Sequence, residues 1–243
     1  MWDKVFGKKY DYYTTSLPIS YVELKGHLTY YPKPDTIDPG EEYRGHTIVK
    51  EGTSYTIDGL SGVYPTLYDA VVSINTTVFT EVTGIEDKKL LAIYTDADSD
   101  TNGLLSWQEI RSFQMKINRT FQYIRNETAL SPHRFLQEGG GDCEDWALFM
   151  AGLLRFWNYE AYIGSVNFKD KYHAITIVKV KELPCNSRGY RITRAVLESG
   201  ELLPMGVYTY IDYYRVGRLT RASGRKPQLI RISSPEWYYG KKM

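Results

Sequence analysis

The sequence has few cysteines, almost no net charge and no long apolar run, and each of these absences excludes a class of protein. Two cysteines in 243 residues cannot build a disulfide-rich scaffold. The 30 basic and 29 acidic residues leave a net charge of +1, which argues against a protein built around nucleic-acid phosphates. Because no stretch approaches about 18 uninterrupted apolar residues, we expect no transmembrane helix.

The composition that remains is that of a globular protein, with 42% hydrophobic and 24% charged residues. The chain is rich in tyrosine, with 22 residues, which suits half-buried strands and contact surfaces but names no chemistry. The first residues, MWDKVFGKKYDYY, lack the apolar core of a secretory signal peptide. We therefore expect either a protein that is not secreted by that route or a trimmed chain.

The first third of the chain is expected to be rich in β-structure. Aromatic and β-branched residues alternate with polar ones in several short runs that turn signals separate. A stretch further on, residues 64–82, fits a helix and a strand equally well. The predicted strands are residues 21–31, 43–50 and 53–62.

Helical patterns begin after residue 84. Residues 86–97 predict a short helix and residues 106–126 a longer one, whose apolar residues recur every three or four positions. Residues 131–141 are expected to form a loop. Residues 143–157 are almost wholly apolar beyond the first turn, which predicts a helix buried on most sides.

Three strand-like runs follow this apolar helix. Turn-forming residues 184–189 lie between the second and third runs, which predicts that these two pair as a hairpin. Further tyrosine-rich strands are expected after Pro204. The three runs are residues 161–168, 173–180 and 190–197.

Residues 98–109, DSDTNGLLSWQE, fit the calcium-loop pattern D-x-[DN]-x-[DN]-G-x5-E without a gap and resemble an EF-hand. In such a loop, alternate residues supply oxygen ligands and the last position supplies a bidentate carboxylate. No second loop of this kind is present in the sequence, so a lone calcium ion would act as a structural clamp rather than a sensor. The candidate Ca²⁺ ligands are Asp98, Asp100, Asn102, the Leu104 carbonyl, Ser106 and Glu109.

The same segment also fits a helix start without metal. Ser106 would be the N-cap, and Glu109, three residues later, would complete a capping box. The two interpretations are compatible, since a calcium loop ends where its exit helix begins.

A second motif, SPHRFLQEGGGDCEDWALFMAGLLRFW at residues 131–157, resembles the transglutaminase-like cysteine peptidase superfamily. The matching features are Pro132, glycines 139–141, the block from Asp142 to Asp145 and the apolar helix behind it. His173 then opens a strand as the family's histidine does. The resemblance covers roughly residues 110–200 and implies a papain-like Cys–His–acid site that acts on an amide.

The expected fold is therefore α+β, with a papain/transglutaminase-like core in which a buried cysteine helix packs on an antiparallel sheet. We expect a β-rich region over residues 1–84, an EF-hand-like helix-loop-helix over 85–126, and a catalytic domain over 110–243.

The chemistry of Cys143 agrees with this resemblance. At a helix N-terminus, the dipole and free N–H groups favour a thiolate, the nucleophile that attacks an amide carbonyl. Glu144 and Asp145 oppose this, since nearby negative charge raises a thiol pKa, so a histidine must do much of the activation. His173 is the candidate. Taken singly, Cys143 also fits a small buried cysteine capped by Asp142, and His173 a hydrogen-bonded residue at a strand end.

The remaining histidines are expected to have ordinary roles. His27 and His46 are predicted to be polar strand residues and His133 an exposed loop residue.

The third catalytic residue is less strongly specified. The predicted hairpin would place Gly200 opposite His173 and Glu198 on the diagonal, within reach of the imidazole. Asp212 is the rival acid, although it lies beyond a further turn signal. The resemblance also suggests Gln137 for the oxyanion hole, by its spacing from Cys143, and Asp142 and Glu144 as a rival calcium site.

These features favour a calcium-braced cysteine peptidase or amidase in which Cys143 attacks, His173 relays the proton and Glu198 orients the imidazole. The substrate would be a protein or a peptide, for instance a cell-wall cross-link. One alternative is transglutaminase-type acyl transfer to an amine. Another is a non-catalytic calcium-binding structural or recognition module. Calcium use favours an extracellular, periplasmic or virion setting.

Overall fold

The structure is a computed structural model in which the chain divides into two compact units, residues Met1–Pro32 with Gln114–Met243, and residues Lys33–Phe113. Among the described residues, no helix is both long and apolar enough to cross a membrane. The described residues are 12–14, 18–26, 37–83, 87–100, 104–127, 129–157, 159–168, 171–184, 186–197, 200–217 and 228–235.

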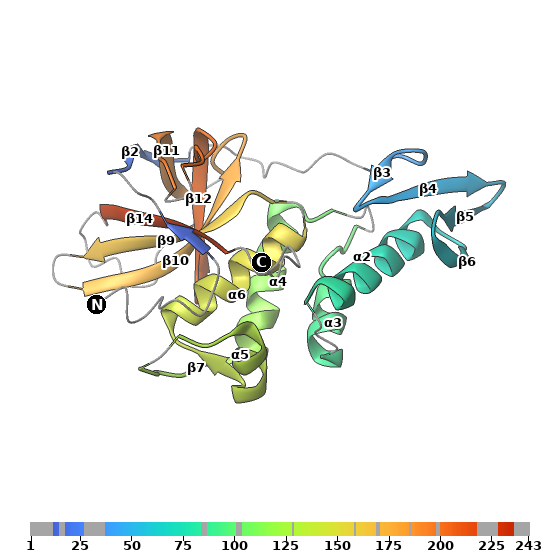
Figure 1. Cartoon of the computed structure of the whole chain (residues 1–243), viewed down its shortest axis with the longest axis horizontal. Coiled ribbons are helices and arrows are strands. Elements are labelled where there is room, and N and C mark those ends of the chain that lie inside the picture. Colours follow the sequence, from blue (N-terminus) through green and yellow to red (C-terminus); the bar gives the residue numbers. More distant parts are fainter. Residues whose placement is uncertain are drawn as a thin grey trace. The chain divides into compact units, whose positions relative to one another are not determined.

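The unit of residues Lys33–Phe113 contains a four-stranded antiparallel meander that packs on a helix (Figure 1). Helix α2 occupies the stretch that fitted both helix and strand. Its residues Ala70, Val71 and Ile74 recur at helical spacing and bury against Ile48 and Ile57 of the sheet, which decides the helix. The elements are β3 (Glu42–Tyr43), β4 (His46–Glu51), β5 (Ser54–Ile57), β6 (Leu60–Tyr64), α2 (Leu67–Thr83) and α3 (Lys88–Thr95).

The other unit is built on an antiparallel sheet in the order β1-β14-β9-β10-β12-β11-β2, with β13 paired to β12. The sheet curls so far that Leu229 N on β14 donates to the Tyr21 hydroxyl on β2, at 3.0 Å. The curled face encloses a core of tyrosine and aliphatic side chains. The strands are β1 (Tyr12–Thr14), β2 (Ser20–Lys25), β9 (Ala161–Phe168), β10 (Lys171–Val180), β11 (Arg188–Arg194), β12 (Gly206–Asp212), β13 (Arg215–Val216) and β14 (Gln228–Pro235).

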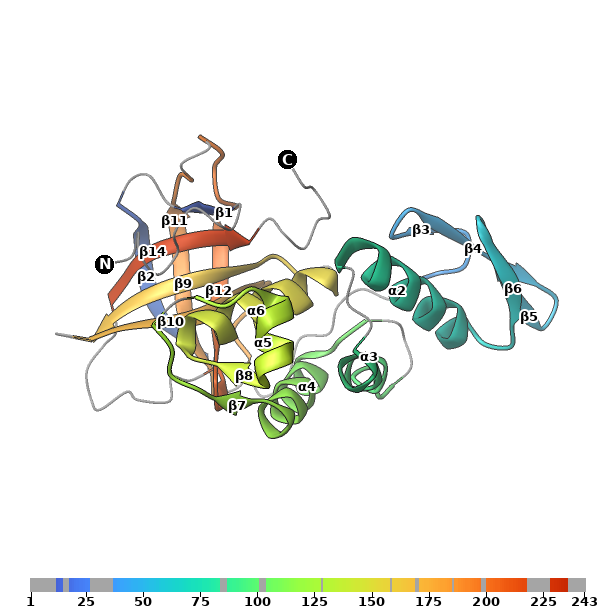
Figure 2. The same ribbon diagram turned by 60° about the horizontal axis from the view of Figure 1, so that its bottom comes forward.

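Helices cover the other face of this sheet. The cysteine helix, α6, lies along β9 and β10, with α5 against it (Figures 1 and 2). Thr176 on β10 donates from its hydroxyl to the Ala147 carbonyl of α6 at 3.1 Å, which fixes the helix on the strand. The remaining elements are α4 (Trp107–Thr120), β7 (Gln122–Tyr123), α5 (Pro132–Glu138), β8 (Gly140–Gly141) and α6 (Cys143–Phe156).

The predicted hairpin between the second and third strand runs is wrong. Strand β12 lies between β10 and β11 and pairs with both. Strand β11 also pairs with β2 on its other side, so both β12 and β11 lie inside the sheet. Because β10 and β11 both run antiparallel to β12, they are parallel to each other, and residues 181–187 cross over β12 and return along part of its length.

Two other expectations differ from the structure. The predicted loop at 131–141 contains α5, because Ser131 caps it, Pro132 starts it and Gly139 ends it in a left-handed conformation at φ +75°. The first strands, β1 and β2, join the sheet of the unit that carries Cys143 rather than a separate N-terminal region.

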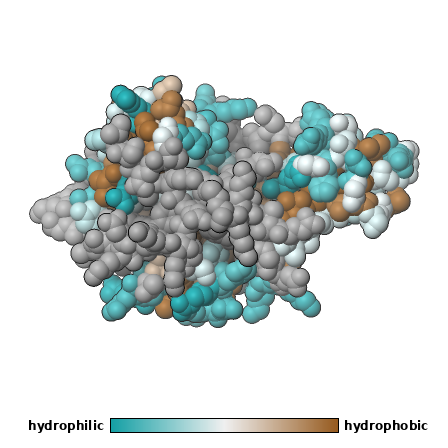
Figure 3. All heavy atoms as spheres, viewed as in Figure 1, coloured by the Kyte–Doolittle hydropathy of each residue, from teal (hydrophilic) through white to brown (hydrophobic). Residues whose placement is uncertain are grey.

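On the face that Figure 3 shows, the described residues are mixed in polarity. Figure 3 shows hydrophobic atoms in separate patches among hydrophilic ones. The most exposed large apolar side chains are Val63, Met205 and Leu202, at 69%, 69% and 68% of full exposure.

Candidate functional site

Cys143 is the first residue of α6, and the start of this helix is closed by a capping box. The Asp142 side chain accepts from Glu144 N at 3.2 Å, and the Asp145 carboxylate accepts from Asp142 N at 3.0 Å. Asp145 also accepts from Asn126 Nδ2 and Leu130 N, so its charge is held by donors away from the sulfur. The capping interpretation of Asp142 and Asp145 is therefore confirmed, and it fixes Cys143 at a helix N-terminus.

The glycines before the cysteine allow neighbouring groups to approach the backbone closely. Gly140 has φ +149°, and a Cβ there would overlap the Gln122 carbonyl of the paired strand β7. A Cβ on Gly141 would overlap the Asp145 carboxylate that forms the capping box. Glycine at these two positions lets β7 and Asp145 approach closely enough to hold the segment that leads into Cys143.

His173 on β10 is hydrogen-bonded to a buried carboxylate. Its Nε2 lies 2.8 Å from Asp212 Oδ1, and the side chains of His173 and Asp212 are 20% and 1% exposed. Asp212 is the last residue of β12, the strand beside β10. With Nε2 bound to Asp212, Nδ1 is the ring nitrogen that can take a proton from a nucleophile.

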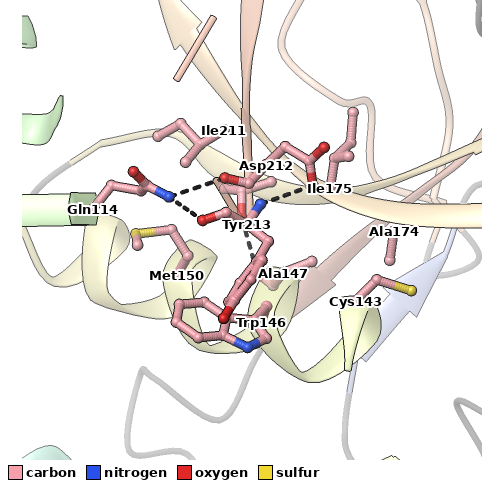
Figure 4. Close-up of a pocket in the computed structure, with 11 residues that line it drawn as sticks. Gln114, Cys143, Trp146, Ala147, Met150, Ala174, Ile175, Ile211, Asp212 and Tyr213 are labelled. Carbon is pink, nitrogen blue, oxygen red and sulfur yellow. Dashed lines mark hydrogen bonds between the residues drawn. The ribbon is translucent and has the colours of Figure 1, made fainter. Parts of the chain in front are cut away.

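The thiol of Cys143 lies against the same stretch of β10. The backbone N–H of Ala174, the residue after His173, acts to lower the pKa of the thiol. Cys143 and Asp212 both line one small pocket, together with Gln114, Trp146, Ala174 and Tyr213 (Figure 4). The structure thus brings the predicted cysteine and histidine segments together at one end of α6.

The thiol of Cys143 is in its protonated form in this arrangement. It donates to Glu144 Oε2 at 3.0 Å, and burial together with the Glu144 charge raises the pKa of the thiol well above its ordinary value. Although burial acts to raise the pKa of Glu144, hydrogen bonds from Asp142 and Cys143 and the nearby His173 lower it. Glu144 is therefore ionised beside the sulfur, one of the two acidic residues that the sequence interpretation expected to oppose the thiolate.

Asp142 and Glu144 form a carboxyl–carboxylate pair around the sulfur. Burial, and then the hydrogen bond and charge of Glu144, raise the pKa of Asp142 to about 8. One of the two carboxyls thus keeps its proton at neutral pH. Oxygen atoms of both residues and the Cys143 sulfur lie within 4.8 Å of one another, a grouping that could also hold a cation.

The other predicted residues either lie outside the described residues or are placed elsewhere in the structure. Glu198 and His27 lie outside the described residues. The hairpin that placed Glu198 beside His173 does not form, and Asp212, the rival acid, is bound to the imidazole. Gln137 is exposed on α5 and is absent from the described lining of the pocket. His46 Nδ1 lies 3.0 Å from the Asp58 carbonyl on the meander, as an ordinary strand residue.

Sequence reasoning did not single out Gln114, Asn118 or Tyr213. Both amides lie on α4 and donate to the backbone of the Asp212–Tyr213 segment. Gln114 is a polar residue of α4 that is only 2% exposed. The sequence does not distinguish a buried glutamine from one on the helix surface.

The acidic loop at 98–109 lies between α3 and α4, as the helix-loop-helix prediction requires. Carboxylate oxygens of Asp98, Asp100 and Glu109 lie within 4.8 Å of one another. Asn102 lies outside the described residues, whereas Leu104 and Ser106 are described next to the helix start. Three of the predicted ligands are therefore close enough to share one cation.

The capping box of this loop is confirmed. Ser106 N donates to Glu109 Oε2 at 2.7 Å, and Glu109 N donates to the Ser106 hydroxyl at 3.3 Å. Glu109 Oε1 also accepts from Ser99 N and Asp100 N, at 2.6 and 3.0 Å. Burial raises the pKa of Glu109, but these hydrogen bonds outweigh it and the net pKa is lowered, so Glu109 is ionised.

Calcium would have to compete for the Glu109 oxygens. A bidentate ligand directs both carboxylate oxygens at the ion. In this structure the same oxygens accept hydrogen bonds from backbone N–H groups. The charge and placement of the three carboxylates suit a cation, but the contacts of Glu109 are those of a helix cap.

Neither a protein-family model nor a curated protein matches the chain. A solved structure named "Putative Cysteine Protease from Cytophaga hutchinsonii" is similar over 92% of this chain and 82% of that chain, with 12% sequence identity and a TM-score of 0.24. A likeness this low carries no argument about fold or activity.

Proposed function

We propose that this protein is a cysteine hydrolase that cleaves a peptide or isopeptide bond through a thioester acyl-enzyme. The observation that carries the proposal is the pairing of His173 Nε2 with the buried Asp212 carboxylate at 2.8 Å, next to the Cys143 helix start. A cysteine nucleophile requires a thiol, an imidazole and an acid that orients the imidazole, and the residue after His173 lines the same pocket as Cys143.

The bonds change in two stages. As the Cys143 sulfur attacks the substrate carbonyl, its proton passes to His173 Nδ1, and Asp212 stabilises the imidazolium that forms. The carbon–nitrogen bond then breaks, and His173 returns the proton to the leaving amine. Water attacks the thioester in the second stage and regenerates the thiol. The Cys143 N–H at the start of α6 is placed to help stabilise the oxyanion.

Attack requires release of the thiol from Glu144. The hydrogen bond to Glu144 holds the proton on sulfur, so the structure represents a resting form. Substrate or a cation that draws Glu144 away would leave His173 as the acceptor of that proton. No step of the reaction is otherwise assigned to a metal ion.

Calcium binding at 98–109 is the second part of the proposal. Asp98, Asp100 and Glu109 would supply carboxylate oxygens there, with Asn102, the Leu104 carbonyl and Ser106 completing the set expected from the pattern. The ion would stabilise the start of α4.

The hydrolase proposal is tested with a mixed peptide library whose new ends are read by mass spectrometry. The wild type should cleave peptides, and Cys143→Ala and His173→Ala should each lose activity by up to about 10⁶-fold, with the double variant hardly worse than either alone. Cleavage that persists in Cys143→Ala would refute the proposal.

Two alternatives give different results in the same assay. With a fluorescent primary amine added, a transglutaminase would attach the amine to peptides through Cys143 in preference to hydrolysis. The raised pKa of the Cys143 thiol favours the other alternative, a non-catalytic module, which would leave every peptide intact with and without the amine.

A further inference from the structure

We propose that Gln114 and Asn118 of α4 are positioning residues for the Asp212–His173 pair, an inference that rests on the proposed function. The two amides lie one helical turn apart and face the same short segment of chain. Gln114 Nε2 donates to the carbonyls of Asp212, at 3.2 Å, and of Tyr213. Asn118 Nδ2 donates to the Tyr213 carbonyl at 3.1 Å (Figure 4 shows the Gln114 bonds).

The segment they hold is weakly fixed by the sheet itself. The described ladder between β10 and β12 ends at the pair Thr176–Ile211, one residue before Asp212. In the described ladders Asp212 is opposite Arg215 of the two-residue strand β13, and Tyr213 lies in the turn between them. Turn carbonyls normally face water. Here the carbonyls accept hydrogen bonds from α4 on the buried side of the turn, where Gln114 is 2% exposed.

The hydrogen bonds to these carbonyls also help to orient the Asp212 carboxylate. Tyr213 N donates to Asp212 Oδ1 at 2.8 Å, and the same oxygen is 2.8 Å from His173 Nε2. A shift of the peptide between Asp212 and Tyr213 would therefore move the Tyr213 N–H, which orients the Asp212 carboxylate toward the imidazole of His173. Because a misplacement of about 1 Å can cost about 100-fold in rate, a helix that fixes this peptide is part of the site's geometry.

The test replaces each amide by leucine and compares it with Gln108→Leu, a matched change at an exposed position of α4. The first readout needs no substrate: it is the downfield proton NMR resonance of the His173 N–H that is bonded to Asp212. We expect this resonance in the wild type and in Gln108→Leu, and its loss in Asp212→Asn. In Gln114→Leu its exchange with water should be at least about tenfold faster, and Asn118→Leu should shift it in the same direction.

The second readout is hydrolysis. Gln114→Leu should lower kcat by about 10- to 100-fold with little change in KM, and it should have almost no further effect when Asp212 is already Asn. A purely structural role would instead lower the melting temperature and act equally in both backgrounds. Asn118 is half-buried, so Asn118→Leu provides the answer if Gln114→Leu does not fold.

The outcomes separate the two proposals. If Gln114→Leu and Asn118→Leu both keep the wild-type resonance and kcat while Cys143→Ala is inactive, the positioning role is refuted and the hydrolase stands. If the resonance responds as expected but the wild type cleaves nothing, the positioning role stands and the hydrolase is refuted.

Discussion

Burial and the charge of Glu144 together raise the pKa of the Cys143 thiol. The Glu144 carboxylate accepts the thiol proton at 3.0 Å, and its charge adds to burial in raising the pKa of the thiol. The helix N-terminus favours the thiolate but acts on the same sulfur more weakly than an adjacent full charge. The side chain beside the nucleophile is therefore as important to its ionisation as the helix below it.

Glu144→Gln should make Cys143 more reactive. The change keeps the shape but removes the negative charge, so the pKa of the thiol falls and the thiolate fraction at pH 7.5 rises. Because nucleophilicity falls as the pKa falls, a tenfold rise in the thiolate fraction should speed iodoacetamide alkylation by only about threefold. Alkylation is followed at the Cys143 peptide by mass spectrometry, and Glu138→Gln, at an exposed residue of α5, is the control. An unchanged or slower rate would show that burial alone sets the pKa of the thiol.

The identity of the third catalytic residue gives a second prediction. Asp212→Asn keeps the shape of the acid but loses the charge that stabilises imidazolium, so kcat should fall by a factor between about 10 and 10⁴. Glu198→Gln should have little effect, since the hairpin that would bring it to His173 is absent. The kcat values of the two variants decide the matter. A crippled Glu198→Gln beside an active Asp212→Asn would restore Glu198 as the acid.

Helix α4 carries two of the features proposed above. Glu109 lies in its first turn, within the acidic loop, and Gln114 and Asn118 lie five and nine residues further on. Disorder at the start of this helix would propagate along it, since helix formation is cooperative. The loop and the Asp212 turn are thus connected through one continuous element.

Calcium should stabilise the protein, and Glu109→Gln should weaken that effect. A ligand that binds only the folded state adds about 2.7 kcal/mol at a hundredfold excess over its dissociation constant. Activity should also fall in EGTA before global unfolding, because α4 loses its anchored start. The measurement is a melting curve with calcium and with EGTA for the wild type and the variant.

The same curves can contradict this prediction in two ways. Identical wild-type curves would leave residues 98–109 as a capped acidic turn. A calcium shift that survives Glu109→Gln but vanishes in Glu144→Gln would place the ion beside Cys143, where Asp142 and Glu144 lie.

The stability of the whole molecule should depend on the proton of Asp142. The folded pKa is about 8 and the ordinary value is 3.8, so the folded state binds more protons than the unfolded state between these values. Stability from this group is fully present below about pH 4 and is lost as the pH rises through 8.

Asp142→Asn should flatten that dependence. Asparagine keeps the N-cap but carries no charge, so the melting temperature of the variant should change less between pH 5 and pH 8 than that of the wild type. Each kcal/mol corresponds to about 2–4 °C in a protein of this size. A steeper fall in the variant than in the wild type would mean that Asp142 is ionised in the folded protein.

Features that depend only on neighbouring residues were predicted correctly from the sequence. The caps follow from side chains within one turn of the backbone groups they bind, as at Asp142 and at the pair Ser106 and Glu109. The buried helix behind Cys143 follows from its continuous apolar run. Such signals are local, so a single sequence contains them completely.

The tertiary structure alone decided the acid and its support. His173 and Asp212 are 39 residues apart, and Gln114 and Asp212 are 98 apart. Their contacts depend on β12 inserting between β10 and β11 and on which helix covers its end. Strand order depends on contacts across the whole sheet, which no turn motif encodes, so the local hairpin signal favoured Glu198 while the sheet placed Asp212 beside His173.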